Sequence, residues 1–104
     1  MPTLSGTARA LHGLKLTAGV ELVVTIEQAS QPSQLELVVT TAGTAPVYWT
    51  TDNTPATVGG DRTRVIPAEV VAVDQVAVSR LADYPKAYVR VISDAAATIS
   101  VQKG

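Results

Sequence analysis

The single histidine, His12, is the residue of this sequence best suited to acid–base chemistry, because its unperturbed pKa lies near neutral pH. A histidine that acts as a general base activates a nucleophile such as Ser5 only within hydrogen-bond reach. The surrounding sequence, RALHGLK, contains neither a nucleophile elbow nor a triad signature. A surface or packed histidine is the simpler interpretation, so we expect no catalytic residue and no enzymatic activity.

Several aspartates fall where turns are expected, with Asp52 and Asp61 at the two ends of a long loop and Asp83 and Asp94 in two further connections. Carboxylates that converge can bind calcium, but none of these forms an Asp-x-Asp-x-Asp-Gly loop. Since aspartate accepts hydrogen bonds from nearby backbone N–H groups in turns, turn capping is favoured over calcium binding. The VGGD string at residues 58–61 lacks the Lys-Ser/Thr pair and the helix of a phosphate-binding loop. We therefore predict no metal and no cofactor.

The long loop follows the only tryptophan of the chain. Tyr48 and Trp49 are adjacent in VYWTTD, and adjacent side chains of a strand point to opposite faces, so one should fill the core and the other be exposed. Sugar-binding modules stack sugars on several coplanar aromatics, and one tryptophan, three tyrosines and no phenylalanine make such a platform thin. A protein-docking module can use one anchor aromatic with apolar, Thr-rich edges and loops, so docking is favoured.

The amino-acid composition limits which other kinds of fold and function are open to this chain. A chain of 104 residues is one domain with one core, and the absence of cysteine leaves no disulfide and no thiolate zinc site. Eight Lys/Arg and nine Asp/Glu are scattered singly, giving a net charge of −1, which disfavours direct nucleic-acid binding. The apolar runs are far shorter than the ~20 residues that span a bilayer. The N-terminus lacks a secretory signal pattern, so we expect no membrane association and no Sec export.

The elements that position these residues are predicted to be strands, because β-branched Val, Thr and Ile are abundant. Residues 20–28 and 35–41 alternate apolar and polar positions and predict an antiparallel hairpin. Residues 47–51 and 62–66 flank the long loop as two strands. Residues 70–80 alternate with a possible slip at Asp74-Gln75. AYVRVIS and ATISVQK predict a final strand pair around Asp94-Ala95.

The first sixteen residues are ambiguous. Leu4, Ala8, Leu11 and Leu14 have helical spacing, but Gly6 weakens a helix. A packed strand, a short helix and an arm that orders on a neighbouring subunit remain open, and we favour the arm or an edge strand. The prediction is an all-β fold: a single small antiparallel β-sandwich or barrel of about eight short strands, with residues 1–16 as an N-terminal arm or edge strand and residues 17–104 as the β-sandwich domain.

Two stretches, VYWTTDNTPATVGGDRTRVIPA and KAYVRVISDAAATISVQKG, carry a resemblance. They resemble the small β-domain virion proteins of tailed bacteriophages, particularly of actinobacterial hosts. The matching residues are 47–68 and 89–101. Asn53 stands where glycine is common, and the turn at residues 94–96 lacks glycine, so the turn types differ from that pattern.

The resemblance implies a virion structural role: a capsid decoration (cement) protein or minor capsid protein that binds the outside of the shell and stabilises it. Its implied partners are the major capsid protein and copies of itself, with trimers at local threefold positions, and its location is the capsid surface after synthesis in the host cytoplasm. A tail or head–tail component and a carbohydrate-binding or adhesin module are the alternatives. The residues expected at the interface are Trp49, Thr54, Pro55, Thr57, Arg62, Arg64, Leu4 and Leu11.

Overall fold

The computed structural model of the chain describes residues 3–4, 10–27, 29, 33–51, 54–60, 63–78 and 86–103. The described residues form nine strands and no helix, and therefore contain no helix that could cross a membrane. The all-β prediction is confirmed. The strands are β1 (Thr3–Leu4), β2 (Ala10–Leu16), β3 (Leu22–Ile26), β4 (Ser33–Thr41), β5 (Val47–Thr50), β6 (Arg64–Ile66), β7 (Val73–Val78), β8 (Ala87–Ser93) and β9 (Ala97–Lys103).

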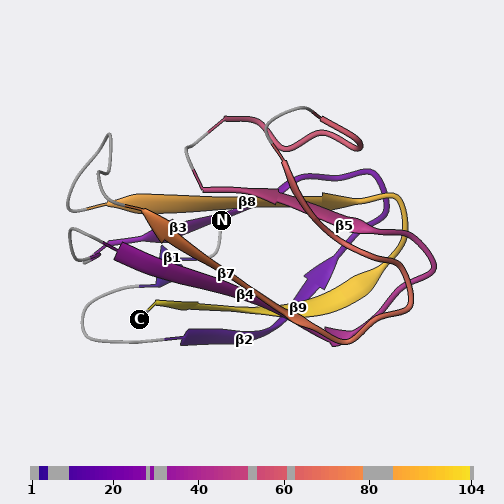
Figure 1. The fold of residues 1–104 in the computed structure, drawn as a ribbon, viewed down its shortest axis with the longest axis horizontal. Helices are drawn as coiled ribbons and strands as arrows, with labels where there is room; N and C mark the ends of the chain where they lie inside the picture. The colour runs from indigo at the N-terminus through magenta and orange to yellow at the C-terminus, as the bar shows by residue number, and fades with distance from the viewer. Residues whose placement is uncertain are drawn as a thin grey trace.

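The strands form two sheets that pack face to face (Figure 1). The first is five-stranded in the order β1-β3-β8-β5-β6, and the second is four-stranded in the order β2-β9-β4-β7. Successive strands from β2 to β5 alternate between the sheets, and the chain turns back through the β5–β6 pair. The returning strands then pair with the outgoing ones, as β4 with β7, β3 with β8 and β2 with β9. The chain is thus one long antiparallel ribbon wound into a sandwich.

This winding corrects two of the predicted pairings. Residues 20–28 and 35–41 do not form a hairpin, because β3 pairs with β8 and β1 whereas β4 pairs with β9 and β7 in the other sheet. The strands β8 and β9 also lie in different sheets, so the turn at Asp94-Ala95 is a corner between sheets. In addition, β7 is regular across Asp74-Gln75, with no slip in its pairing with β4. The two strands predicted around the long loop are β5 and β6, and they pair antiparallel.

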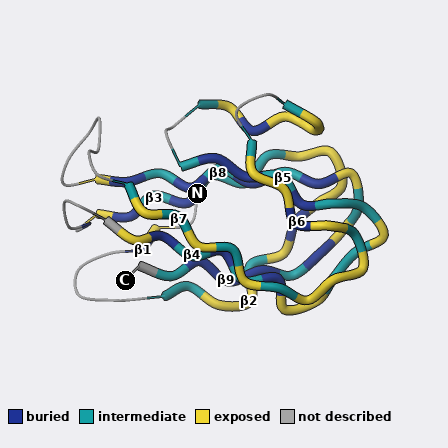
Figure 2. Tube along the Cα trace, in the orientation of Figure 1, coloured by how far each residue is buried: buried dark blue, intermediate teal, exposed yellow. Residues whose placement is uncertain are grey.

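The core lies between the two sheets and follows the predicted alternation. In β8, buried and half-buried residues alternate without exception, as Figure 2 shows by the broken blue pattern along the strand. In β5, Trp49 is fully buried and Tyr48 is half-buried on the opposite face, which confirms that one aromatic fills the core. The largest fully buried side chains are Trp49, Leu4, Ile26, Leu35, Leu37 and Ile99.

The described part of the N-terminal segment belongs to both sheets of its own chain. Strand β1 adds to the edge of the five-stranded sheet, parallel to β3, and the Leu4 side chain is 0% exposed. Strand β2 forms an edge of the four-stranded sheet by pairing with β9, with a bulge between Leu11 and Leu14 where Gly13 has φ 68°. The described residues 3–4 and 10–16 therefore form edge strands of the chain's own sheets.

Candidate docking surface

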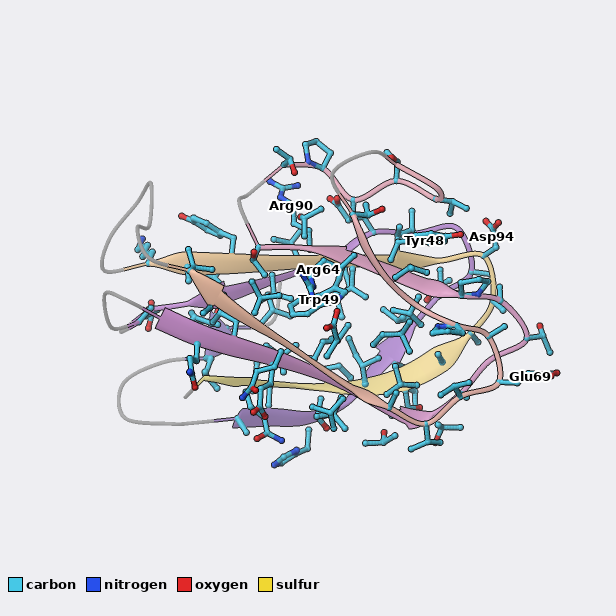
Figure 3. All side chains as sticks on the ribbon, in the orientation of Figure 1. Tyr48, Trp49, Arg64, Glu69, Arg90 and Asp94 are labelled. Atoms are coloured by element: carbon cyan, nitrogen blue, oxygen red, sulfur yellow. The ribbon has the colours of Figure 1, made fainter. Side chains whose placement is uncertain are left out.

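Three polar side chains from three strands meet where the sandwich is open between β6 and β7. The Trp49 Nε1–H donates to Asp74 Oδ2 at 2.8 Å. The Arg64 guanidinium donates to both carboxylate oxygens, from Nε to Oδ2 and from Nη2 to Oδ1, each at 3.0 Å. Figure 3 shows Trp49 and Arg64 side by side between the two layers. Because β5 and β6 belong to one sheet and β7 to the other, this cluster fastens the two sheets together.

The geometry of this cluster favours the ionised forms of Asp74 and Arg64. The hydrogen bond from Arg64 lowers the pKa of Asp74; partial burial opposes this shift, and donation from Trp49 adds to it. The pKa of Arg64 is in turn raised by its hydrogen bond to Asp74. Both groups are therefore ionised at neutral pH, and a bidentate pair of this kind holds its geometry well. The cluster acts as a clamp within the chain rather than as a group that exchanges protons.

These contacts change the role of three residues predicted at the interface. Trp49 and Leu4 are each 0% exposed, so neither side chain is available as a surface anchor, because both are core residues. Arg64 has a half-exposed side chain, but its guanidinium is engaged by Asp74 of the same chain. The sequence misassigned Trp49 and Leu4 because strand alternation sets which residues share a face without showing which face is covered.

The loop at residues 54–60 carries three more of the predicted residues, of which Pro55 and Thr57 are exposed and Thr54 is half-buried. The loop crosses the outer side of the five-stranded sheet (Figure 1). Thr50 Oγ1 donates to the Thr54 carbonyl at 2.7 Å, and the loop residue Ala56 is 3% exposed. An irregular loop that is tied to the sheet in this way presents a fixed surface to a partner.

Glu21 makes a second contact that holds this loop in place, and the sequence did not predict this contact. Its Oε2 accepts the Ala56 backbone N–H at 2.6 Å, and its Oε1 accepts from Arg90 Nη1 at 2.9 Å. Glu21 and Ala56 are 35 residues apart in the sequence, so no local signal reports their contact. The carboxylate thus connects the start of β3, the middle of β8 and the loop.

Replacing Glu21 with alanine is expected to release the loop while the sheets stay folded. A hydrogen bond to a charged group contributes roughly 1.5–3 kcal/mol, so the Ala56 amide should exchange with solvent about tenfold faster or more. Hydrogen exchange followed by nuclear magnetic resonance measures this rate residue by residue. Glu27→Ala, at an exposed position just after β3, is the matched control. Unchanged exchange at Ala56 in the Glu21 variant would contradict the assigned tie.

An apolar row crosses the outer face of the five-stranded sheet beside this loop. Tyr48 of β5 lies directly opposite Val65 of β6 on one side and Ile92 of β8 on the other. Val65 is 54% exposed, and Tyr48 and Ile92 are half-buried. Cross-strand neighbours lie about 5 Å apart, so the three side chains form a continuous strip, which we call the Tyr48 row.

Exposed valines continue along the chain from this row. After Val65, the side chains of Val70, Val71 and Val73 are 40%, 68% and 61% exposed, which places four of the exposed large hydrophobic residues within one short segment. Single exposed apolar residues are ordinary, and this segment runs from β6 of one sheet to β7 of the other, so only Val65 belongs to the Tyr48 row. Amino-acid composition does not indicate this exposure, because valines in a strand are expected on either face.

The other candidates lie apart from this surface or outside the described residues. Leu11 is half-buried on β2 in the opposite sheet, and Arg62 lies outside the described residues. The same holds for Asp52, Asp61 and Asp83, whereas Asp94 is an exposed residue of the corner between β8 and β9. The described part of the chain contains no group of three or more metal-ligating side chains.

His12 forms a hydrogen bond between its Nδ1 and Ser100 Oγ at 3.0 Å. A serine and a histidine in contact could in principle act as nucleophile and base. However, Ser100 is only 2% exposed, so its hydroxyl is not presented to a substrate. The contact ties edge strand β2 to β9 across the bulge and is structural.

Comparison with known proteins bears on the fold alone. No protein-family model matches the chain, and no curated protein matches it in sequence. Its structure is similar to the solution NMR structure of a de novo designed double-stranded beta-helix, with a TM-score of 0.53. The two are 11% identical, and the match covers 92% of this chain and 99% of the designed one. The fold is a β-sandwich wound as a double-stranded β-helix. The wound ribbon described above is the pattern of such a fold, and folds of this kind carry many unrelated functions.

Proposed function

We propose that the chain is a bacteriophage virion structural protein that binds the outside of the major capsid shell and stabilises it. The observation that carries the proposal is the Tyr48 row, a partly exposed apolar strip beside a loop that is held by Thr50 and Glu21. The two stretches that resemble phage virion proteins lie around this row. The matching residues, 47–68 and 89–101, contain β5, β6 and most of β8, which are neighbours in one sheet, together with part of β9.

The chemistry of this surface suits a protein partner. An apolar strip with a polar rim is typical of the centre of a protein interface. A net charge of −1 and singly scattered cations suit a shell exterior better than packaged DNA. A capsid shell has many equivalent sites, so many copies of this chain can bind to it and to each other. Contacts that are weak for one copy then give strong attachment overall.

Two other functions remain as alternatives. A tail or head–tail component would use the same surface, and copy number separates the two: hundreds of copies per particle indicate decoration, and tens or fewer indicate the neck or tail. A sugar-binding module is less well supported, because Trp49 is buried and hydrogen-bonded to Asp74. Its remaining surface aromatics among the described residues are the half-buried Tyr48 and Tyr88.

Replacing Val65 with aspartate is expected to abolish binding to the particle without unfolding the chain. The side chain is 54% exposed, so the change costs little stability, whereas a charge in the centre of an interface is strongly unfavourable. Co-sedimentation of the purified chain with particles that lack it measures binding. Val20→Asp, at a valine that is 55% exposed in the turn between β2 and β3, is the matched control. If both variants bind the particle equally well, the Tyr48 row is not the binding surface. If the chain binds glycans and Tyr48→Ala abolishes that binding, the sugar-binding module is favoured instead.

A further inference from the structure

The four edges of the two sheets are not alike. An edge strand exposes unpaired backbone groups, and proteins protect such edges with short strands, bulges, lysines or proline. Strand β1 has two residues and β6 has three, followed by Pro67. Strand β2 has seven residues but contains the bulge near Gly13 and the exposed Lys15. Three edges are therefore protected by recognised means.

The fourth edge, β7, has none of these four protections, and its one protective feature is an inward-facing charge. It has six residues, Val73–Val78, with no proline or lysine, and it pairs with β4 without a bulge. Its only charge is Asp74, an inward-facing group that is neutralised by Arg64. The side chains that it presents to solvent are Val73, Gln75 and Ala77, all uncharged. Such a strand is a ready template for another strand.

The backbone groups on the open side of β7 follow from its register. The Val39 N–H donates to the Ala72 carbonyl at 2.8 Å, and the pairing continues regularly from Val38–Val73. Since hydrogen-bonded and non-hydrogen-bonded pairs alternate in an antiparallel ladder, Val73, Gln75 and Ala77 direct their N–H and C=O groups away from β4. The Gln75 N–H also interacts with the Asp74 carboxylate, so Val73 and Ala77 offer the freest groups.

We propose that two copies of this chain form a dimer in which their β7 strands pair antiparallel about a two-fold axis. The sequence of β7 is self-complementary in this arrangement. With the axis at Gln75, Val73 faces the partner's Ala77, and Gln75 faces the partner's Gln75, so no charge opposes a like charge. The two four-stranded sheets then become one continuous sheet, and the unprotected edge is removed. A two-fold contact of this kind closes with two copies, whereas a trimer needs a contact between unlike surfaces.

This inference does not depend on binding to a capsid, so the two proposals can fail separately. The Tyr48 row lies on the five-stranded sheet and stays accessible when β7 of the four-stranded sheet is paired. The pairing strand is short, and contacts below the standard interface size are weak, so we expect association at micromolar to millimolar concentration.

The test is sedimentation velocity of the full chain across that concentration range, with the variants Gln75→Lys and Gln75→Glu. Like charges directly opposite each other in a ladder are destabilising, so each variant alone should dimerise up to about fivefold more weakly. An equal mixture of the two variants should restore the dimer, because lysine then faces glutamate. Gln75 is exposed, and its side-chain amide donates to Glu36 directly opposite in β4, so we expect Gln75→Glu to be less stable than Gln75→Lys. Circular dichroism checks that both variants fold.

A second pair of variants locates the contact independently. Val73→Lys places a lysine on the proposed edge and should weaken the dimer, whereas Val20→Lys changes a comparably exposed valine in the turn between β2 and β3 and should not. The proposal is overturned by a chain that stays monomeric up to millimolar concentration. It is equally overturned by a trimer, or by a dimer that responds to neither the Gln75 variants nor Val73→Lys.

Discussion

Leu4→Ala is expected to lower the free energy of unfolding by about 2–4 kcal/mol, the usual cost of removing a buried leucine side chain. The Leu4 side chain is 0% exposed and belongs to the core, although it lies in a strand of only two residues. Its backbone is also held, since the Glu27 N–H donates to the Leu4 carbonyl at 3.0 Å. Urea denaturation followed by tryptophan fluorescence measures the change.

This result distinguishes an edge strand from an arm. An arm that orders only on a neighbouring subunit would add nothing to the stability of the isolated chain, so Leu4→Ala would leave the unfolding midpoint unchanged. Thr3→Ala, at the exposed neighbour in β1, is the matched control and should change stability by less than about 0.5 kcal/mol. Removal of residues 2–12 should likewise destabilise the fold, because it deletes β1 and the first part of β2.

Asp74→Ala is the second large effect, with an expected loss of about 2–3 kcal/mol. Most of it comes from the Trp49 N–H, which is left buried without its acceptor, at a cost of roughly 1–3 kcal/mol. The ion pair with Arg64 adds only about 0.5 kcal/mol, because the Arg64 side chain is 49% exposed and its charge is screened by solvent. Thermal or urea unfolding measures the total.

A double-mutant cycle isolates the indole contribution. Phenylalanine at position 49 has no N–H to satisfy, so Asp74→Ala should cost about 1–2 kcal/mol less in a Trp49→Phe background than in the original chain. Equal costs in the two backgrounds would show that the Trp49–Asp74 hydrogen bond contributes nothing to stability.

The same carboxylate makes stability depend on pH with a defined sign. The folded-state pKa of Asp74 is lowered, so the folded chain binds this proton less readily than the unfolded chain does. The stabilisation is therefore fully present well above the unfolded pKa of about 4 and is lost as the pH falls through the lower, folded value. Asp74→Asn cannot ionise, so the stability difference between it and the original chain should be constant near neutral pH and shrink below about pH 4.

The sequence alone predicted the strands well, because strand periodicity is a local signal. The alternation in residues 22–26 and 35–39 predicted inward positions that the structure confirms as buried, at Val24, Ile26, Leu35, Leu37 and Val39, whereas Val20, predicted on the same face, is 55% exposed. Adjacent Tyr48 and Trp49 point to opposite faces as expected. The all-β class followed from β-branched composition in the same way. These features need no knowledge of which strands are neighbours.

Pairing could not be predicted in this way, because alternation sets the face of a strand and not its neighbour. Consecutive strands usually pair, so residues 20–28 and 35–41 favoured a hairpin, but each strand here belongs to a different sheet. The tie between Glu21 and Ala56 and the clamp between Trp49 and Asp74 depend on that winding. Their partners are 35 and 25 residues apart, and neither pair has a sequence signature.

The wound ribbon also sets an order of events for the chain as it folds. The pair β5–β6 joins the nearest segments, whereas β2–β9 joins segments close to the two ends. Closing a longer loop costs more entropy, but each inner pair shortens the loop that remains for the next one. Folding should therefore begin at β5–β6 and proceed through β4–β7 and β3–β8, with β2–β9 last. A chain still emerging from the ribosome can form the first of these pairs, but the sandwich closes only after β9 has been synthesised.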